Sequence, residues 1–389
     1  MTGDILREGA ILTVDLDAVV SNWRLLSAAS KPAECAAVVK ADAYGLGAAE
    51  IALSLQAAGC QTFFVAHLDE GLELRKAIGF SSRIFVLNGT PRGTEYDFLK
   101  SVLIPVVNTV GELAAWQHCA GAAGRSMPIA LQLDTGMTRL GLAPGDIAML
   151  AADPALLIGL SVELIMSHLA CADQSAHSAN DRQRREFAKL RSVLPKKAGS
   201  SLANSAGVFI GRGFHFDLVR PGAALYGLNP TPGRPNPMKE VVGLSARVIQ
   251  LRDVPTGTFV GYGHTKRTAR PSKLATISLG YADGWPRSAC TSAFFHDTAM
   301  PFIGRVSMDS IVVDATDSAG TLREGAFVDI VCSEQTVDDV ASASGTIGYE
   351  ILVRLGRRFR REYRSLAMLD ERPGKSGEHE LSLNQKVET

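Results

Sequence analysis

The sequence predicts an α/β protein with an N-terminal (β/α)8 TIM-type barrel and a mainly β C-terminal domain. In the first two-thirds of the 389 residues, eight short apolar runs alternate with longer amphipathic stretches. This alternation is typical of parallel strands joined by crossover helices, and eight such units match a closed barrel. After the proline-rich segment 229–237, short β-type runs replace the long helical periodicity. A doubly wound open sheet is the alternative for the first part, because strand count alone does not determine topology.

The expected barrel begins with a helix over residues 16–27, where Leu16, Val19, Trp23 and Leu26 recur at helical spacing. The expected strands that follow are 35–40, 62–66, 84–87, 103–107, 129–134, 162–167, 202–205 and 216–220. Helical patterns lie between most of them, for example at 70–78, 110–120 and 181–193. These elements place the barrel within residues 1–240.

The second domain is expected over residues 241–370. Its predicted strands are 245–251, 274–279, 303–306, 310–314 and 327–331, separated by glycine-rich turns. Long helical periodicity does not return before about Gly348. The segment 371–389 is polar and lacks an apolar face, so we predict a flexible tail there.

Composition and charge exclude several classes of protein. The 40 Lys and Arg residues balance 40 Asp and Glu residues, which argues against a nucleic acid or an anionic membrane as the main partner. The first residues include Asp4 and no apolar run typical of a signal peptide. Six cysteines are scattered without a Cys-x-x-Cys pair, so no metal site is predicted and a cytoplasmic location is expected.

The segment AAVVKADAYGLG, residues 36–47, is the first candidate for chemistry. Lys40 ends a buried-type strand there, and the carboxyl ends of barrel strands are where barrel enzymes hold their active sites. A desolvated lysine loses its proton readily and can bond covalently to a carbonyl group. The structural alternative is a strand-end lysine in a salt bridge.

Several motifs resemble those of the alanine racemases in order and spacing. VKADAYGLG at 39–47 is similar to the lysine motif by which that family binds pyridoxal phosphate. The further blocks are DTGMTRLG (134–141), MSH (166–168), ANS (203–205), VRPG (219–222) with YG (226–227), GYADG (280–284), GRVSMD (304–309) and TIGYE (346–350). The resemblance extends from about residue 11 to 360, over both predicted domains.

The resemblance implies a fold-type III pyridoxal 5'-phosphate enzyme that works as a homodimer with sites shared between subunits. Lys40 would hold the cofactor covalently, and convergent donors would bind its phosphate, since a dianion needs several N–H and O–H groups. The cofactor-binding residues implied are Lys40, Tyr44, His168, Asn204, Ser205, Arg220, Gly222, Ala223 and Tyr349. His168 would lie on or beside the cofactor ring.

Arg220 would face the pyridine nitrogen. A guanidinium only donates hydrogen bonds, so the nitrogen would stay unprotonated and the ring would be a weaker electron sink. This disfavours transamination as a side reaction. Without the other motifs, Arg220 would equally suit a structural clamp on a carboxylate.

Racemisation requires proton transfer on both faces of a planar carbon, so two bases are expected. The resemblance implies Lys40 as one base and Tyr262, in the sequence VGYG (260–263), as the other. An arginine near Tyr262 would stabilise its phenolate. Arg139 and Met308 would hold the carboxylate of the substrate alanine.

Two positions depart from the family pattern. Gln132 stands where many members have a carbamylated lysine that orients the arginine corresponding to Arg139, and Ser201 stands where some have a histidine beside Arg220. Neither departure removes a catalytic group, but both leave the orientation of the two arginines open.

Three other functions compete with alanine racemisation. A non-catalytic pyridoxal-phosphate carrier shares the barrel and its lysine but lacks the second domain. A fold-type III decarboxylase would present an acid, not Arg220, to the pyridine nitrogen. A racemase for serine or a larger amino acid is the hardest to exclude, and the sequence leaves a biosynthetic or catabolic role open.

Overall fold

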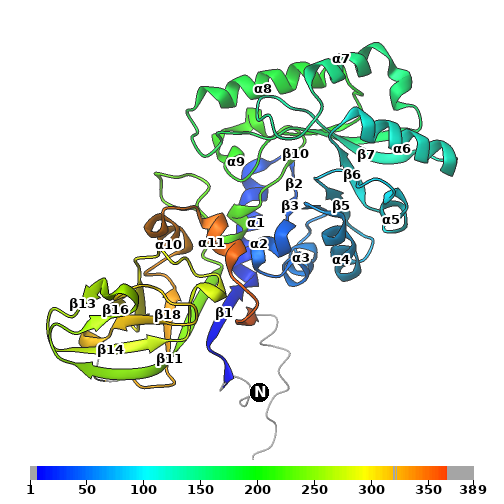
Figure 1. The fold of residues 1–389 in the computed structure, drawn as a ribbon. Coiled ribbons are helices and arrows are strands. Elements are labelled where there is room, and N and C mark those ends of the chain that lie inside the picture. The colour runs from blue at the N-terminus through cyan, green and yellow to red at the C-terminus, as the bar shows by residue number, and fades with distance from the viewer. Residues whose placement is uncertain (1–6, 319, 321, 366–389) are drawn as a thin grey trace, which may run out of the picture.

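The protein was analysed as a computed structural model that describes residues 7–318, 320 and 322–365. The predicted flexible tail, 371–389, lies outside these described residues. Two sheet systems organise the chain, one made of parallel strands and one mainly of antiparallel strands (Figure 1). Across the described residues, we find no helix with the length and apolar character that a membrane crossing needs.

The parallel system is the predicted (β/α)8 barrel. Seven strands, β3 to β9, follow one another in sequence order. The ring closes because β10 pairs in parallel with β2, and a parallel bridge joins Asn204 to Arg220. The strands are β2 (Glu34–Cys35), β3 (Ala37–Val38), β4 (Thr62–Val65), β5 (Arg83–Val86), β6 (Ile104–Val107), β7 (Met127–Gln132), β8 (Leu160–Met166), β9 (Gly199–Ser201) and β10 (Leu218–Val219).

The interior of the barrel is packed with apolar side chains. Phe64 and Phe85 stack there with ring centroids 4.9 Å apart. Further members of this buried cluster are Ala36, Val38, Ile104, Val106, Ala130, Leu164, Met166 and Leu218. The barrel is therefore a filled core, and its open space lies at one end of the strands.

Helices surround the barrel, and capping side chains determine several of their ends. Asp15 accepts a hydrogen bond from the amide of Ala18 at 2.8 Å and begins α1. Thr109 and Glu112 form a capping box at α6. The helices are α1 (Leu16–Ser30), α2 (Lys40–Gly45), α3 (Ala48–Ala57), α4 (Leu68–Ile78), α5 (Glu95–Lys100), α6 (Val110–Ala123), α7 (Pro144–Ala152), α8 (Ser178–Arg191) and α9 (Gly207–Ile210).

The second system is an antiparallel-rich sheet below the barrel in Figure 1. Its strand order is β16-β15-β18-β11-β1-β19, and β14 pairs with β11 and β17. The strands are β1 (Ala10–Asp15), β11 (Val242–Val254), β14 (Ser272–Ile277), β15 (Ser292–Phe295), β16 (Thr298–Pro301), β17 (Ile311–Asp314), β18 (Phe327–Val331) and β19 (Arg360–Arg364). A separate short hairpin pairs β12 (Phe259–Val260) with β13 (Lys266–Arg267).

Strand β1 belongs to this second sheet although the barrel follows it directly in the chain. It pairs antiparallel with β11 and in parallel with β19. Its side chains alternate between buried and half-buried, as expected for a strand with one face on a core. The N-terminal strand therefore connects the two parts of the molecule, and the predicted division at 240 stays a prediction.

Three local expectations were wrong. Residues 303–306 form a turn and not a strand, because Gly304 has φ +83° and packs against the carbonyl of Val260. The strand expected at 202–205 lies earlier, as β9, and Asn204 instead caps a turn by accepting from the amide of Gly207 at 2.9 Å. Two helices, α10 (Val337–Ser344) and α11 (Gly348–Arg354), follow β18, and the first was not predicted.

Candidate active site

The segment after β3 has an unusual backbone. Lys40 follows the strand, and Ala41, Asp42, Ala43 and Tyr44 all have positive φ, between 51° and 58°. The left-handed conformation costs about 1–2 kcal/mol for each non-glycine residue. Such strain persists only where surrounding contacts determine it, and it is concentrated at functional sites.

Side-chain oxygens satisfy the amides around this left-handed turn. Glu70 accepts from the amide of Ala41 at 2.7 Å, and Asp42 accepts from the amide of Ala48 at 2.8 Å. The other carboxylate oxygen of Glu70 accepts from the amides of Ala66 and His67. Glu70 therefore joins the lysine turn to the start of α4. Glu70 could not be selected from the sequence, because its partners are backbone groups on separate segments.

A cavity of about 790 Å³ opens at the carboxyl ends of the barrel strands. The structure brings ten of the predicted site residues to its wall, which are Lys40, Tyr44, Arg139, His168, Asn204, Ser205, Arg220, Gly222, Ala223 and Tyr349. The wall also contains side chains that sequence analysis did not select, among them Phe64, Leu87 and Asn88. Leu87 and Asn88 directly follow β5, so their place at a strand end was the available signal.

Arg220 lies in this wall with 4% of its surface exposed. It donates from Nη2 to the carbonyl oxygen of Ser167 at 2.5 Å and from Nη1 to the hydroxyl of Ser201. No carboxylate among the described residues forms an ion pair with it. Desolvation of this buried cation lowers the pKa of Arg220 to about 9. Arg220 therefore remains a hydrogen-bond donor at neutral pH.

Ser201 explains how Arg220 can be oriented without the histidine that some family members have at this position. Its hydroxyl donates to the carbonyl of Leu218 at 2.6 Å, so it presents a lone pair to Arg220. A serine in this position can thus orient the guanidinium without a titrating ring.

In two further cavity residues, His168 and Lys40, the pKa is shifted toward the uncharged form. Burial, followed by the charges of Arg220, Arg139 and Lys40, lowers the pKa of His168 to about 3. Burial, followed by the charge of Arg139, lowers the pKa of Lys40, while Glu70 opposes this shift. The cavity therefore favours a neutral imidazole and increases the neutral fraction of the lysine amine.

Hydrogen-bond donors converge beside Lys40. Ser205 accepts from the amides of Gly222 and Ala224 at 3.0 and 3.2 Å, which leaves its own proton available to a ligand. A Cβ on Gly222 would lie 2.6 Å from the Tyr44 hydroxyl, so only glycine fits this cradle. Burial raises the pKa of Tyr44, which stays a protonated donor.

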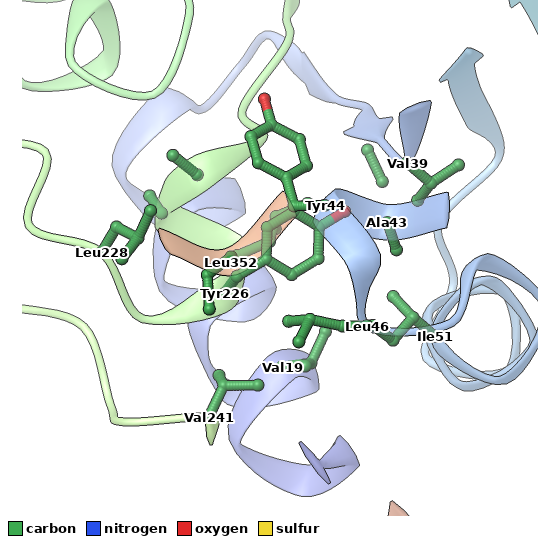
Figure 2. Close-up of a cluster of buried hydrophobic side chains, with 14 of the residues drawn as sticks. Val19, Val39, Ala43, Tyr44, Leu46, Ile51, Tyr226, Leu228, Val241 and Leu352 are labelled. Atoms are coloured by element: carbon green, nitrogen blue, oxygen red, sulfur yellow. The ribbon is translucent and has the colours of Figure 1, made fainter. Parts of the chain in front are cut away.

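Aromatic packing holds Tyr44 in place. Its ring centroid is 4.9 Å from that of Tyr226 and 6.1 Å from that of Tyr349. Tyr226 is anchored because its hydroxyl donates to the carbonyl of Val38 at 2.7 Å. Figure 2 shows Tyr226 within the apolar cluster and the Tyr44 hydroxyl directed out of it. Burial also raises the pKa of Tyr349, which lines the cavity with Tyr44. The glycine cradle, the donating serine and these two protonated tyrosines fit a phosphate, and the neighbouring lysine and arginine fit the rest of pyridoxal phosphate.

Gln132 ends β7 and lines the cavity together with Arg139. Its side-chain amide donates to the carbonyl of Leu140 at 3.4 Å. The arginine loop itself is ordered by Asp134, which accepts from the amides of Gly136, Met137 and Thr138. This position therefore contributes a neutral group, and the loop backbone carries much of the task of placing Arg139.

Tyr262 and Met308 do not line the cavity among the described residues. Tyr262 is 69% exposed and Met308 is 53% exposed, both in the second sheet region. The loop of Tyr262 packs on Arg305. A Cβ added to Gly263 would lie only 3.5 Å from the Arg305 guanidinium. Of the predicted site residues, these two therefore lie away from the cavity of their own chain, with exposed side chains.

Comparison with known proteins relates both parts of the chain to one family. The family model for "Alanine racemase, N-terminal domain" matches residues 14–230, and that for "Alanine racemase, C-terminal domain" matches residues 241–363. The chain is 51% identical to a catabolic alanine racemase of Mesorhizobium japonicum, covering 91% of this chain and 93% of the relative. An alanine racemase of Rhodospirillum rubrum is 46% identical, with 92% and 96% covered.

Solved structures agree with this result. Alanine racemase from Bartonella henselae with covalently bound pyridoxal phosphate superposes with a TM-score of 0.88 at 42% identity, covering 92% of this chain and 99% of that one. Biosynthetic alanine racemase from Pseudomonas aeruginosa gives a TM-score of 0.84 at 35% identity, with 92% and 100% covered. With both family models and close relatives matching over nearly the whole described fold, the chain belongs to the alanine racemase family of pyridoxal-phosphate enzymes.

Proposed function

We propose that the enzyme interconverts L-alanine and D-alanine with pyridoxal 5'-phosphate held at Lys40. One observation carries the proposal: Lys40, whose pKa is lowered, shares a cavity with the buried Arg220, which has no carboxylate partner among the described residues. A carboxylate in place of Arg220 would suit the decarboxylase alternative. The matched second domain argues against a non-catalytic carrier.

Bound pyridoxal phosphate supplies an electron-withdrawing ring that acidifies the α-hydrogen of an attached amino acid. Ser205, Tyr44 and Tyr349, with the amide of Ala223, would hold its phosphate, and Gly222 leaves room for it because it has no side chain. Arg220 would donate to the pyridine nitrogen, and the uncharged His168 and Asn204 would contact the ring. Lys40 would attach the cofactor.

The protein moves the α-proton with two groups on opposite faces. Lys40 accepts or returns a proton at Nζ, and its lowered pKa increases the fraction of neutral amine available for this. Arg139 fixes the substrate carboxylate, which keeps the α-carbon within reach of Nζ.

Tyr262 is the second base, and it acts in the cavity of a partner subunit. The supporting observation is its 69% exposure on a loop that belongs to the second sheet region. Met308, also exposed, reaches the substrate carboxylate in the same way. The enzyme is therefore a homodimer whose sites combine two chains. Its six cysteines are free, which is consistent with a reducing, cytoplasmic location.

The test is a racemase assay of the purified protein, loaded with pyridoxal phosphate, on single L-amino acids. We expect D-alanine from L-alanine at the highest kcat/KM, measured by chiral chromatography. A Lys40→Ala variant serves as the inactive control. Serine as the preferred substrate would support the alternative racemase, and carbon dioxide release without racemisation would overturn the proposal.

A further inference from the structure

The left-handed turn that carries Lys40 receives two hydrogen bonds from the far end of the described chain. Arg361 donates from Nη2 to the carbonyl oxygen of Gly45 at 3.0 Å. Tyr363 donates from its hydroxyl to the carbonyl oxygen of Leu46 at 3.0 Å. Both donors lie on β19, more than three hundred residues from the turn. These bonds satisfy the carbonyls of the two residues that follow the left-handed run 41–44.

The turn and the C-terminal elements fit closely. A Cβ on Gly47 would overlap the Tyr363 hydroxyl, and a Cβ on Gly45 would lie 2.8 Å from the carbonyl oxygen of Leu352 in α11. Both glycines have positive φ, +86° at Gly45 and +102° at Gly47. The two glycines therefore allow α11 and β19 to approach the turn directly.

Strand β19 is itself fixed against the start of the barrel. It pairs in parallel with β1, with Arg361 opposite Leu12 and Tyr363 opposite Val14. Strand β1 continues into α1. Arg361 also donates to the carbonyl oxygen of Gly356 at 3.1 Å, which fixes the guanidinium between two segments. The two donors therefore lie on a strand that is hydrogen-bonded to its neighbour, so their backbone positions are fixed.

We propose that Arg361 and Tyr363 are positioning residues for the cofactor site. They stabilise the left-handed turn, so that Lys40 and the Tyr44 hydroxyl are directed into the cavity before the cofactor binds. The proposal rests on the proposed function in taking Lys40 as the attachment point. It assigns to the C-terminal strand a part in cofactor binding, although neither side chain lines the cavity.

The alternative is that local contacts alone maintain the turn. Within the turn, the amide of Gly47 donates to the carbonyl of Asp42 at 2.9 Å, and Asp42 binds the amide of Ala48. These local bonds do not prevent a change of backbone conformation at Gly45 and Leu46. The carbonyls of those two residues are bonded by Arg361 and Tyr363. Removal of the two donors therefore distinguishes the two explanations.

The experiment uses the full chain with Tyr363→Phe, Arg361→Met and the double substitution. Arg361→Lys is the conservative rescue, because lysine retains a charged donor. Arg364→Met is the matched control, since Arg364 lies on the same strand with an exposed side chain. Three quantities are measured: hydrogen exchange of the peptide 40–48, the dissociation constant for pyridoxal phosphate, and the visible circular dichroism of the bound cofactor.

Each single substitution should weaken pyridoxal-phosphate binding by about fivefold, as expected for one lost hydrogen bond, and the double by about twenty-five-fold. Exchange of peptide 40–48 should accelerate while a peptide from α8 keeps its wild-type rate, which separates the effect from global unfolding. The circular-dichroism band, which reports how the ring is held, should weaken in the double variant. Arg361→Lys should restore part of each change.

Wild-type exchange, affinity and circular dichroism in a folded double variant would overturn the proposal. Acceleration in the α8 peptide equal to that in peptide 40–48 would also overturn it, because the residues would then support overall stability only. Accelerated exchange with unchanged affinity for pyridoxal phosphate would overturn it as well, because the turn would then not affect cofactor binding. Failure of the proposed function looks different: borohydride trapping of the wild-type protein would label a lysine other than Lys40.

Discussion

The Nη2 atom of Arg220 lies 2.5 Å from the carbonyl oxygen of Ser167 in the wall of the cavity. Ser201 occupies Nη1, and the serine hydroxyl is in turn fixed on Leu218. The guanidinium is therefore held by two neutral oxygens, and no carboxylate neutralises it among the described residues. The guanidinium is therefore a hydrogen-bond donor in a fixed position. A cofactor nitrogen next to it would meet only N–H groups.

Replacement of Arg220 should change the type of reaction and not only its rate. In Arg220→Glu, the new carboxyl can share a proton with the pyridine nitrogen, which makes the ring a stronger electron sink. We expect the fraction of turnovers lost to transamination to rise by about tenfold or more, an effect of about 1.4 kcal/mol on partitioning. The measurement is pyruvate formed per alanine racemised. Arg220→Lys, which keeps a donor, is the control, and unchanged partitioning in Arg220→Glu would contradict the electronic argument.

The charge of Arg139 should control the pH at which Lys40 reacts. Arg139 is the second cause, after burial, of the lowered pKa of Lys40. Removing that charge in Arg139→Met raises the pKa, so the neutral amine becomes abundant only at higher pH. The pH profile for covalent attachment of pyridoxal phosphate should therefore shift upward, while Arg139→Lys should keep a profile close to that of the wild type.

Attachment in this experiment is measured by borohydride trapping followed by peptide mapping. The label should lie on Lys40 at every pH. A label on another lysine, or a downward shift in Arg139→Met, would show that the cavity does not act on this amine in the manner inferred.

The barrel could be predicted from sequence because its signal is local. Apolar runs alternate with amphipathic helices, and each strand end then directs its residues toward one rim. Ten predicted site residues consequently meet in one cavity. The strand at Ala10–Asp15 was missed for the opposite reason, since its partners β11 and β19 lie far along the chain.

The left-handed conformation of Ala41 to Tyr44 could not be predicted from the sequence either. Residue preferences favour right-handed geometry at all four positions, whereas Glu70, Arg361 and Tyr363, which bond to the backbone of this segment, lie far from it in the sequence. The turn at Gly304 has a similar origin, because the close approach of Val260 determines it and apolar neighbours suggest a strand. Tertiary contacts thus decide the backbone where the site needs an unusual one.

Gln132 should make activity independent of dissolved carbon dioxide. Its neutral amide cannot form a carbamate, unlike the lysine at this position in many family members, and Asp134 orders the arginine loop. Removal of bicarbonate should leave kcat/KM for L-alanine unchanged within about twofold. A Gln132→Lys variant should acquire such a dependence and serves as the positive control. A strong loss of wild-type activity without bicarbonate would refute the prediction.

Tyr262 provides the most direct test of a shared site. A Tyr262→Phe protein should bind pyridoxal phosphate normally, because Tyr262 does not line the cavity of its own chain. It should lose α-proton exchange mainly with L-alanine, whereas Lys40→Ala with an added amine should lose it mainly with D-alanine. Exchange is measured by deuterium incorporation into each enantiomer. Equal loss with both enantiomers in Tyr262→Phe would contradict the two-base assignment.

Mixing the two inactive proteins then distinguishes a shared site from a single-chain site. In a dimer of one Lys40→Ala and one Tyr262→Phe chain, one of the two sites combines an intact Lys40 with an intact Tyr262. Random exchange of subunits should restore about a quarter of wild-type activity, because half of the dimers are mixed and each has one competent site. Mass spectrometry verifies that mixed dimers have formed. Mixed dimers without activity would mean that both bases come from one chain, since such a dimer would then lack a complete site.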